Sequence, residues 1–326
     1  MKILLFGKTR TITRLTEDIE RDLNLAGHEV RLFSYRSTKL EKFAEPWLLS
    51  PNLGVPLAKL MVRAVSRFVP DLILAIGPFH WLPPAVFDTV AAMPGRPPMV
   101  AWIADKFGPE AKPAARPFDL IAYSDSGLLP LHRQFGFRPA STFSPLAAAR
   151  DRRGASAAET TRSPRFAFVA SATPHRRALL AAVTEPVDLF GPDWRDGHGL
   201  NRHTRDGRKI REQELASIYR SHAGVLNIRN EENVVNGLNQ RHFAPYIENT
   251  PVLTDLQTDL ACCFDIGTEI LTYRDAEELT SLLAAIGQDP VRARTIGAAG
   301  RRRVLAHHTY THRVEALAAL AGVSGR

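Results

Sequence analysis

The polar residues with the clearest setting for chemistry lie between Val225 and Asp255, where two apolar runs enclose a polar segment. The runs GVLNIR and PVLTD have the composition of buried strands. Between them, the polar loop NEENVVNGLNQ leads into RHFAPYIEN, which favours the start of a short helix. A strand, a loop and a helix start together present backbone N–H groups to a phosphate. This stretch is therefore predicted to bind a phosphate-bearing ligand.

Chemically versatile side chains also follow apolar runs in the first half of the chain. Lys8 and Arg10 follow KILLF, His80 lies in the loop GPFHWLPP after DLILAI, and Asp105 ends MVAWIAD. Ligands of parallel α/β sheets lie at the carboxyl ends of the strands, so these side chains are candidates for binding or proton transfer. The alternatives are solvated loop charges, a hydrogen-bonded structural histidine and a carboxylate that caps the next segment.

The elements that position these first-half residues alternate between apolar runs and helical patterns. This alternation predicts a Rossmann-like domain of parallel strands over residues 1–150. Only Gly7 of the G-x-G-x-x-G pattern is present, which argues against a tightly held dinucleotide. The predicted strands are 2–6, 28–35, 71–76, 99–105 and 118–125.

The α/β pattern restarts in the second half. Residues 147–164 are rich in Ala, Arg, Ser and Thr and predict a linker or a boundary loop. A second Rossmann-like domain follows over residues 165–326, with a short strand at 208–211, Asp275 as a helix N-cap and two C-terminal helices. The last helix is predicted to pack either on the second domain or back on the first. Two such α/β domains predict an interdomain cleft that holds the ligand.

Bulk properties narrow the class of protein. The 326 residues suffice for two domains, and 44% hydrophobic with 23% charged residues is typical of a soluble globular protein. We expect no transmembrane segment, no signal peptide and a cytoplasmic protein whose adjacent cysteines, Cys262 and Cys263, are reduced. The net charge of +8 is spread along the chain without interleaved stacking aromatics, which favours solvated faces and phosphate contacts over nucleic acid.

Three segments resemble the group-1 glycosyltransferases of GT-B fold, and most closely the branch similar to the spore-maturation protein CgeB. The first is FVASATPHRRALLAAV with VDLFGPDW, and the second is the block that starts at GVLNIR. The third is Ile296–Leu317, IGAAGRRRVLAHHTYTHRVEAL. The first half resembles the family more loosely, through FDLIAYSDSG and the WIAD strand.

The resemblance implies sugar transfer from a nucleotide-diphosphate donor, held by the second domain, to an acceptor hydroxyl held mainly by the first. A UDP- or dTDP-sugar is favoured as donor, and the acceptor is a glycan, a protein or a small molecule. Neither a metal nor another cofactor is expected, because backbone N–H groups and basic side chains stabilise the leaving diphosphate. His80 or Asp105 would position or deprotonate the acceptor.

The resemblance also assigns donor-site residues. Arg241 would contact the diphosphate through its planar fork, with pairing to the acids of the NEEN segment as the alternative. Ser171 would face the cleft, and Lys209 and Ile210 would read the nucleobase through their backbone. The residues expected to supply N–H groups are Asn236, Gly237, Leu238, Asn239 and Gln240.

The chain departs from the family at two acids. Ala244 stands where relatives usually carry the glutamate that holds the donor ribose, and Asn236 replaces the acid eight residues earlier. Glu248, one helical turn after Ala244, either takes over ribose binding or is a helix-end acid. These departures leave a second hypothesis, a non-catalytic GT-B relative that binds a sugar nucleotide or a partner protein.

Overall fold

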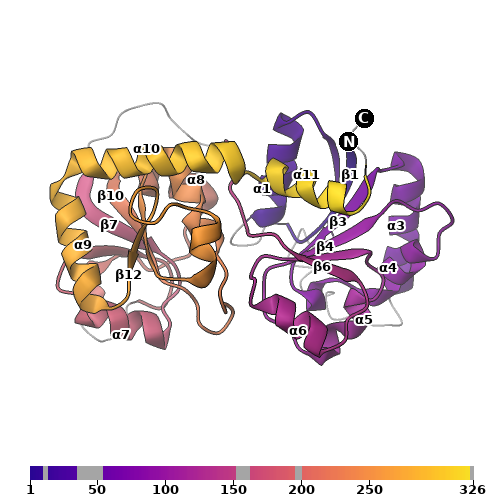
Figure 1. Cartoon of the computed structure of the whole chain (residues 1–326), viewed down its shortest axis with the longest axis horizontal. Coiled ribbons are helices and arrows are strands. Elements are labelled where there is room, and N and C mark those ends of the chain that lie inside the picture. The colour runs from indigo at the N-terminus through magenta and orange to yellow at the C-terminus, as the bar shows by residue number, and fades with distance from the viewer. Residues whose placement is uncertain (10–13, 35–53, 152–161, 195–199, 324–326) are drawn as a thin grey trace. The chain divides into compact units, whose positions relative to one another are not determined.

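The computed structural model describes residues 1–9, 14–34, 54–151, 162–194 and 200–323, which fold into two compact units (Figure 1). The first unit comprises Met1–Leu146 together with Tyr310–Arg326, and the second comprises Ala147–Thr309. Arg10 and residues 152–161, the middle of the expected linker, lie outside the described residues.

The first unit is built on a parallel six-stranded sheet in the order β2-β1-β3-β4-β5-β6. Strands β3 and β4, LILAI and MVAWI, are buried at every residue, as expected for a parallel sheet covered on both faces. The strands are β1 (Lys2–Phe6), β2 (Glu29–Phe33), β3 (Leu72–Ile76), β4 (Met99–Ile103), β5 (Leu120–Tyr123) and β6 (Ala140–Phe143). The helices are α1 (Leu15–Leu25), α3 (Gly54–Phe68), η1 (Phe79–Trp81), α4 (Pro84–Ala91), η2 (Pro109–Ala111), α5 (Lys112–Ala115), α6 (Leu128–Gln134) and α11 (Tyr310–Leu320).

The second unit is also a parallel six-stranded sheet, in the order β12-β11-β10-β7-β8-β9. The strands are β7 (Ser163–Val169), β8 (Val187–Phe190), β9 (Thr204–Asp206), β10 (His222–Asn227), β11 (Val252–Asp255) and β12 (Leu271–Tyr273). The helices are α7 (Pro174–Ala182), η3 (Leu200–His203), α8 (Glu212–Arg220), η4 (Gln240–His242), η5 (Ala244–Glu248), η6 (Thr258–Cys262), α9 (Ala276–Gln288) and α10 (Pro290–His307). The predicted α/β class with two Rossmann-like sheets is therefore confirmed.

Three local predictions were wrong. The first sheet has a sixth strand, β6, which the sequence did not reveal because its four residues, ASTF, are short, polar and partly exposed. The strand expected at 208–211 lies instead at Thr204–Asp206, and residues 207–211 form the loop before α8. The expected short helix after Arg241 consists of two 3₁₀ segments, η4 and η5, of three and five residues.

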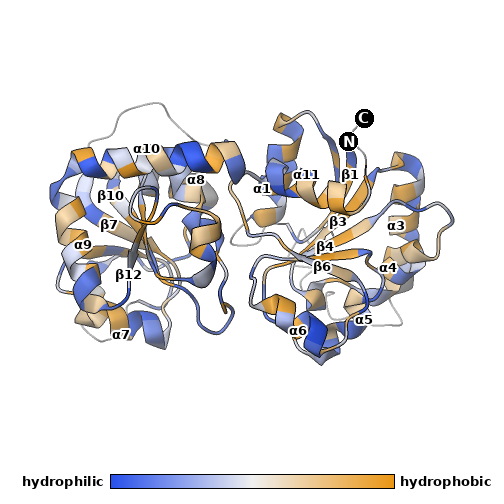
Figure 2. Cartoon of the chain, viewed as in Figure 1, coloured by the Kyte–Doolittle hydropathy of each residue, from blue (hydrophilic) through white to orange (hydrophobic). Residues whose placement is uncertain are grey.

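The helices of the second unit match their sequence signals more closely. Asp275 caps α9, its Oδ1 accepting the N–H of Glu278 at 2.9 Å. Figure 2 shows hydrophilic residues along α10, the longest helix given by the described residues. Within the described ranges, no helix combines the length and the apolar content needed to cross a membrane.

The last helix, α11, is part of the first unit and lies beside α1 (Figure 1). Asp22 of α1 is fully buried, and its Oδ2 accepts hydrogen bonds from the backbone N–H and the hydroxyl of Thr311, at 2.8 and 2.9 Å. Asp22 thus caps the start of a helix almost 300 residues away in sequence.

Replacing Asp22 by alanine is expected to lower the free energy of unfolding by about 2–4 kcal/mol, because the buried N–H of Thr311 loses its acceptor and the Thr311 hydroxyl keeps only the carbonyl of residue 22. Urea unfolding would measure this change, with the partly exposed Glu20→Ala on the same helix as the control. An Asp22→Ala protein as stable as the control would contradict the capping role.

Candidate functional site

The candidate site of the second unit is built at the carboxyl ends of β10 and β11. Asn227 ends β10 and pairs in register with Thr254 of β11, so both polar side chains project from the same part of the sheet. Both residues are fully buried. The loop that follows β10 returns over this edge and supplies Asn239, Arg241 and His242.

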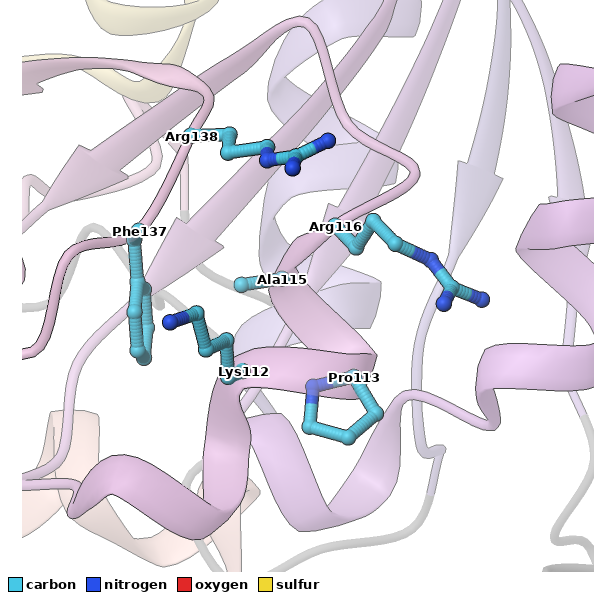
Figure 3. Close-up of a pocket in the computed structure, with 6 residues that line it drawn as sticks. All are labelled: Lys112, Pro113, Ala115, Arg116, Phe137 and Arg138. Carbon is cyan, nitrogen blue, oxygen red and sulfur yellow. The ribbon is translucent and has the colours of Figure 1, made fainter.

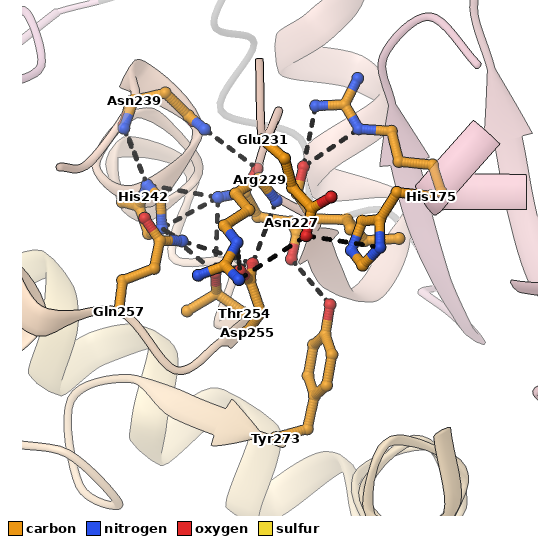
Figure 4. Close-up of polar contacts among 12 residues, drawn as sticks. His175, Asn227, Arg229, Glu231, Asn239, His242, Thr254, Asp255, Gln257 and Tyr273 are labelled. Atoms are coloured by element: carbon orange, nitrogen blue, oxygen red, sulfur yellow. Dashed lines mark hydrogen bonds and ion pairs between the residues drawn. The ribbon is translucent and has the colours of Figure 1, made fainter. Parts of the chain in front are cut away.

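Figure 4 shows the polar network that joins these elements. The His242 ring lies at its centre, fully buried, with the Asn227 amide nitrogen 2.9 Å from its Nε2 and 3.2 Å from its Nδ1. Thr254 Oγ1 lies 3.1 Å from His242 Nε2, and the amide nitrogen of Gln257 lies 3.3 Å from it. The network fixes the path of the loop because its members come from β10, β11, η4 and the turn after β11.

Burial keeps His242 uncharged. The pKa of His242 is lowered to about 3, mainly by burial; a hydrogen bond with the Asn239 backbone opposes the shift and the charge of Arg241 adds to it. The hydrogen bonds agree, because an amide NH₂ can only donate, so the ring nitrogen that faces Asn227 must carry a lone pair. An imidazolium carries a hydrogen on both ring nitrogens and cannot accept this bond, so the ring is neutral in one tautomer or the other.

This buried neutral histidine predicts a pH dependence of stability. Between pH 6.5 and about 3 the unfolded chain binds a proton that the folded chain excludes, so stability is lost as pH falls through this window. Each pH unit corresponds to about 1.4 kcal/mol. From pH 6.5 to 5 the wild-type protein should therefore lose about 2 kcal/mol more than His242→Gln, as measured by urea unfolding. His307→Gln, at an exposed position, should keep the wild-type dependence; equal slopes for His242→Gln and wild type would contradict the prediction.

Arg241 lies directly beside this network. Its Nε donates to Asn227 Oδ1 at 2.9 Å, and its backbone N–H donates to Asn239 Oδ1 at 2.9 Å. Burial lowers the pKa of the Arg241 guanidinium, while Tyr219 and Asp255 oppose that shift. Among the described residues, no carboxylate lies within ion-pair distance of Arg241, so the guanidinium is held by a neutral amide.

The acids of the NEEN segment do not pair with Arg241. Glu231 lies instead 3.7 Å from Arg229 and 3.6 Å from the His175 ring. Arg229 also lies 3.4 Å from Asp255, whose pKa is raised by burial although the Arg229 backbone and side chain oppose the shift. The alternative for Arg241, pairing with the loop acids, is therefore not what the structure contains.

The loop offers fewer backbone donors than the five expected from the sequence. The N–H of Asn239 is already used, because it lies 3.1 Å from His242 Nδ1. The carbonyl of Asn236 accepts from the N–H of Asp259. Gly237 and Leu238 are buried, and their N–H groups donate to no described residue. Gln240 begins η4, and three 3₁₀ residues form too short a helix to bring a substantial dipole to a phosphate.

Arg176 is a site residue that the sequence reading missed. It is 4% exposed, and its guanidinium donates to the carbonyls of Ser171, at 2.9 Å, and Ile228, at 2.8 and 3.2 Å. Burial lowers the pKa of Arg176 to about 10, with Arg241 contributing in the same direction. Arg176 therefore ties the loop after β7 to the end of β10 and adds positive charge close to Arg241.

The remaining donor-site candidates lie on two neighbouring loops. Ser171, in the loop after β7, is exposed and offers its carbonyl to Arg176. Lys209 and Ile210 lie in the loop before α8, where the Lys209 carbonyl accepts from Arg208 at 3.2 Å. The described contacts join Ser171 to the network through Arg176 but do not join Lys209 or Ile210 to it.

Glu248 lies at the opposite, amino-terminal edge of the second sheet. Its Oε2 accepts from Arg220 at 2.9 Å, just before β10 begins, and its carbonyl accepts from Arg162, just before β7. Of its two predicted roles, this buried position corresponds to the structural acid rather than to a ribose contact. Ala244 is also buried, in a small cluster with Tyr219 and Val225.

A second group of candidates gathers at the carboxyl ends of β1, β3 and β4 in the first unit. Lys8, 2% exposed, places its Nζ 4.1 Å from the centre of the Trp81 ring, and His80 packs edge-on against the same ring. Gly77 permits this packing, since its φ is +130° and a Cβ there would come within 2.7 Å of Trp81. Burial raises the pKa of Asp105, while the charge of the neighbouring His80 opposes the rise. The predicted pair His80 and Asp105 is thus brought together.

A cavity of about 400 Å³ also lies in the first unit (Figure 3). It is lined by Lys112, Pro113, Ala115, Arg116, Phe137 and Arg138. Its lining residue Phe137 packs against Phe79, next to His80, with ring centroids 5.7 Å apart. Phe137 also packs against Phe107, two residues after Asp105, with ring centroids 5.3 Å apart. The cavity includes none of the predicted site residues.

Comparisons with known proteins agree with this architecture. Residues 170–319 match the family described as glycosyl transferase-like. The whole fold is similar to sucrose-phosphate synthase from Thermosynechococcus elongatus, with a TM-score of 0.63 and 13% identity over 99% of this chain and 97% of that one. It is also similar to Anabaena HepE in complex with UDP and glucose, with a TM-score of 0.62 and 14% identity over 99% and 100% of the two chains. No curated protein matches the chain significantly in sequence.

Proposed function

We propose that the chain, whose residues 170–319 match a glycosyl transferase-like family, is a GT-B glycosyltransferase that transfers a sugar from a UDP- or dTDP-sugar to an acceptor hydroxyl without a bound metal. The observation that carries the proposal is Arg241, a partly buried cation whose Nε is held by Asn227 while no described acid neutralises it. Such a guanidinium favours a ligand with phosphate oxygens. HepE, which has a similar fold, binds UDP and glucose.

In the proposed reaction, the acceptor oxygen attacks the anomeric carbon and the bond from that carbon to the diphosphate oxygen breaks. The diphosphate leaves with the electron pair, and Arg241 stabilises its negative charge, with Arg176 contributing to the local potential. The N–H groups of Gly237 and Leu238 supply further donors. Asp105 takes the acceptor proton, and His80 lies beside it to position the acceptor.

We also propose that the chain belongs to the branch similar to CgeB. The signatures that support this assignment are residues 168–194 and Ile296–Leu317. The acceptor is a glycan, a protein or a small molecule, and the donor site does not discriminate among these.

A screen of nucleotide sugars tests the proposed function. UDP- and dTDP-sugars should raise the melting temperature of the purified protein more than GDP-sugars, and incubation with acceptor extracts should yield a product one sugar heavier by mass spectrometry. Transfer should persist in EDTA. The proposal fails if no nucleotide diphosphate or nucleotide sugar changes the melting temperature.

The alternative function is donor binding without transfer. Ala244 favours it, because its buried methyl group packs with Tyr219 and Val225 where relatives carry an acid. Under this alternative, UDP-sugars bind but neither hydrolysis nor transfer is detected. Turnover that is abolished by Asp105→Asn would exclude it.

A further inference from the structure

We propose that Asn227 positions Arg241 through an uncharged contact, so that the positive charge of Arg241 is left for the ligand. This inference rests on the proposed function, because it takes the ligand to be a diphosphate. It assigns Asn227, in the middle of the apolar run GVLNIR, as a positioning residue of the donor site.

The orientation of the Asn227 side chain follows from its partners. A guanidinium has only donors, so the Asn227 oxygen must face Arg241 Nε, 2.9 Å away. The amide nitrogen then faces the His242 ring, at 2.9 Å, and Thr254 Oγ1, at 3.4 Å. Asn227 is fully buried, so these partners on η4 and β11 fix it in one orientation.

Apart from Arg241, the side chains that hydrogen-bond with Asn227 are uncharged. Asn227, Asn239, Thr254 and Gln257 carry no charge, and His242 stays neutral because its ring nitrogen accepts from Asn227. Arg176 adds positive charge nearby, and Asp255 accepts from Thr254 and Gln257. Asp255, an acid whose charge acts on Arg241, also accepts from the Arg229 backbone at 3.0 Å and lies 3.4 Å from the Arg229 side chain. The positive charge of Arg241 is therefore not cancelled where it is anchored.

The anchoring also leaves the useful face of Arg241 unoccupied. Only Nε of its side chain donates to a described residue, so the two terminal nitrogens remain for a bidentate contact with phosphate. An aspartate at position 227 has nearly the same shape as asparagine and would still accept from Arg241 Nε. It would also form a buried ion pair and cancel the charge that the ligand needs.

The isosteric variant Asn227→Asp tests the inference, with inorganic pyrophosphate and UDP as probes in calorimetric titrations at pH 8. The dissociation constants of both probes should rise 10- to 100-fold, although the contact to Arg241 is kept. Asn227→Ala removes the contact without adding charge, so its affinity should fall between those of the wild type and Asn227→Asp. Asn249→Asp, at an exposed position, controls for the added negative charge.

A purely structural role for Asn227 predicts the reverse order, with Asn227→Ala binding worst, and that order would overturn the inference. If Asn227→Asp does not fold, Asn239→Asp puts a carboxylate on the Arg241 backbone N–H and next to Asn227 Oδ1, the oxygen that holds the guanidinium, at a position where aspartate caps equally well. Its affinity should also fall at least tenfold, and unchanged affinity would overturn the inference. A wild-type protein that binds neither UDP nor pyrophosphate would refute the proposed function itself, whereas wild-type binding with unaffected variants would refute only this inference.

Discussion

Replacing Arg241 by alanine is expected to lower kcat/KM for the nucleotide sugar by about 10²- to 10³-fold, the effect typical of removing one preorganised donor from developing negative charge. The guanidinium is partly buried, oriented by Asn227 and not paired with any described acid. Its attraction to phosphate is therefore screened by water less than that of an exposed arginine, and no carboxylate pairs with it directly among the described residues. Most of the loss should appear in kcat, because charge accumulates on the diphosphate as the glycosidic bond breaks.

Two further variants make the Arg241 prediction specific. Arg241→Lys keeps the charge but loses the planar fork, so it should recover only part of the activity. Arg292→Ala, at an exposed position on α10, should leave kcat/KM within twofold of the wild type. Wild-type kinetics for Arg241→Ala would show that the diphosphate lies elsewhere.

Asp105→Asn is expected to lower kcat by about 10²- to 10⁴-fold with little change in donor affinity, as for the loss of a general base. Burial raises the pKa of Asp105, which makes the carboxylate a stronger base than an exposed aspartate. The base acts deprotonated, so the rate should rise with pH through a pKa above 3.8, and this limb should be absent from Asp105→Asn. His80→Gln removes the charge that lowers the pKa of Asp105, so the same limb should move to higher pH.

Asp88→Asn is the matched control, because Asp88 forms an ion pair with Arg116 at 2.6 Å in the same unit. It should leave kcat and its pH profile unchanged. If Asp105→Asn retains wild-type kcat, the acceptor proton goes to another group, and His80→Ala then becomes the decisive variant.

The sequence predicted the fold well where burial controls the pattern. Runs such as LILAI and MVAWI are apolar because both faces of a parallel strand are covered, and both formed strands. The prediction failed where local composition and tertiary pairing disagree. ASTF forms β6 only because β5 offers it a hydrogen-bonding edge, and Pro245 falls where a regular helix after Arg241 would have to continue.

The candidate site was predictable only in outline. Arg241 was predicted from the family resemblance and from the match of its planar fork to phosphate, but Asn227, His242 and Arg176 were not predicted. Their roles depend on the pairing of Asn227 with Thr254 and on carbonyls that converge from two loops, which a linear sequence does not display. One signal was present: both Asn227 and Thr254 interrupt apolar runs, and a polar residue inside a buried strand requires a partner.

The helix α11 has a consequence for the way the chain is divided. Because residues 310–326 belong to the first unit, the second unit is an insertion, and its two ends meet where Ala148 donates to the carbonyl of His308 at 3.1 Å. Residues 147–309 thus form one continuous segment with adjoining termini, suited to expression alone or to circular permutation. The first unit, in contrast, is assembled from two separate segments, so the whole second unit must be synthesised before α11 can cover α1.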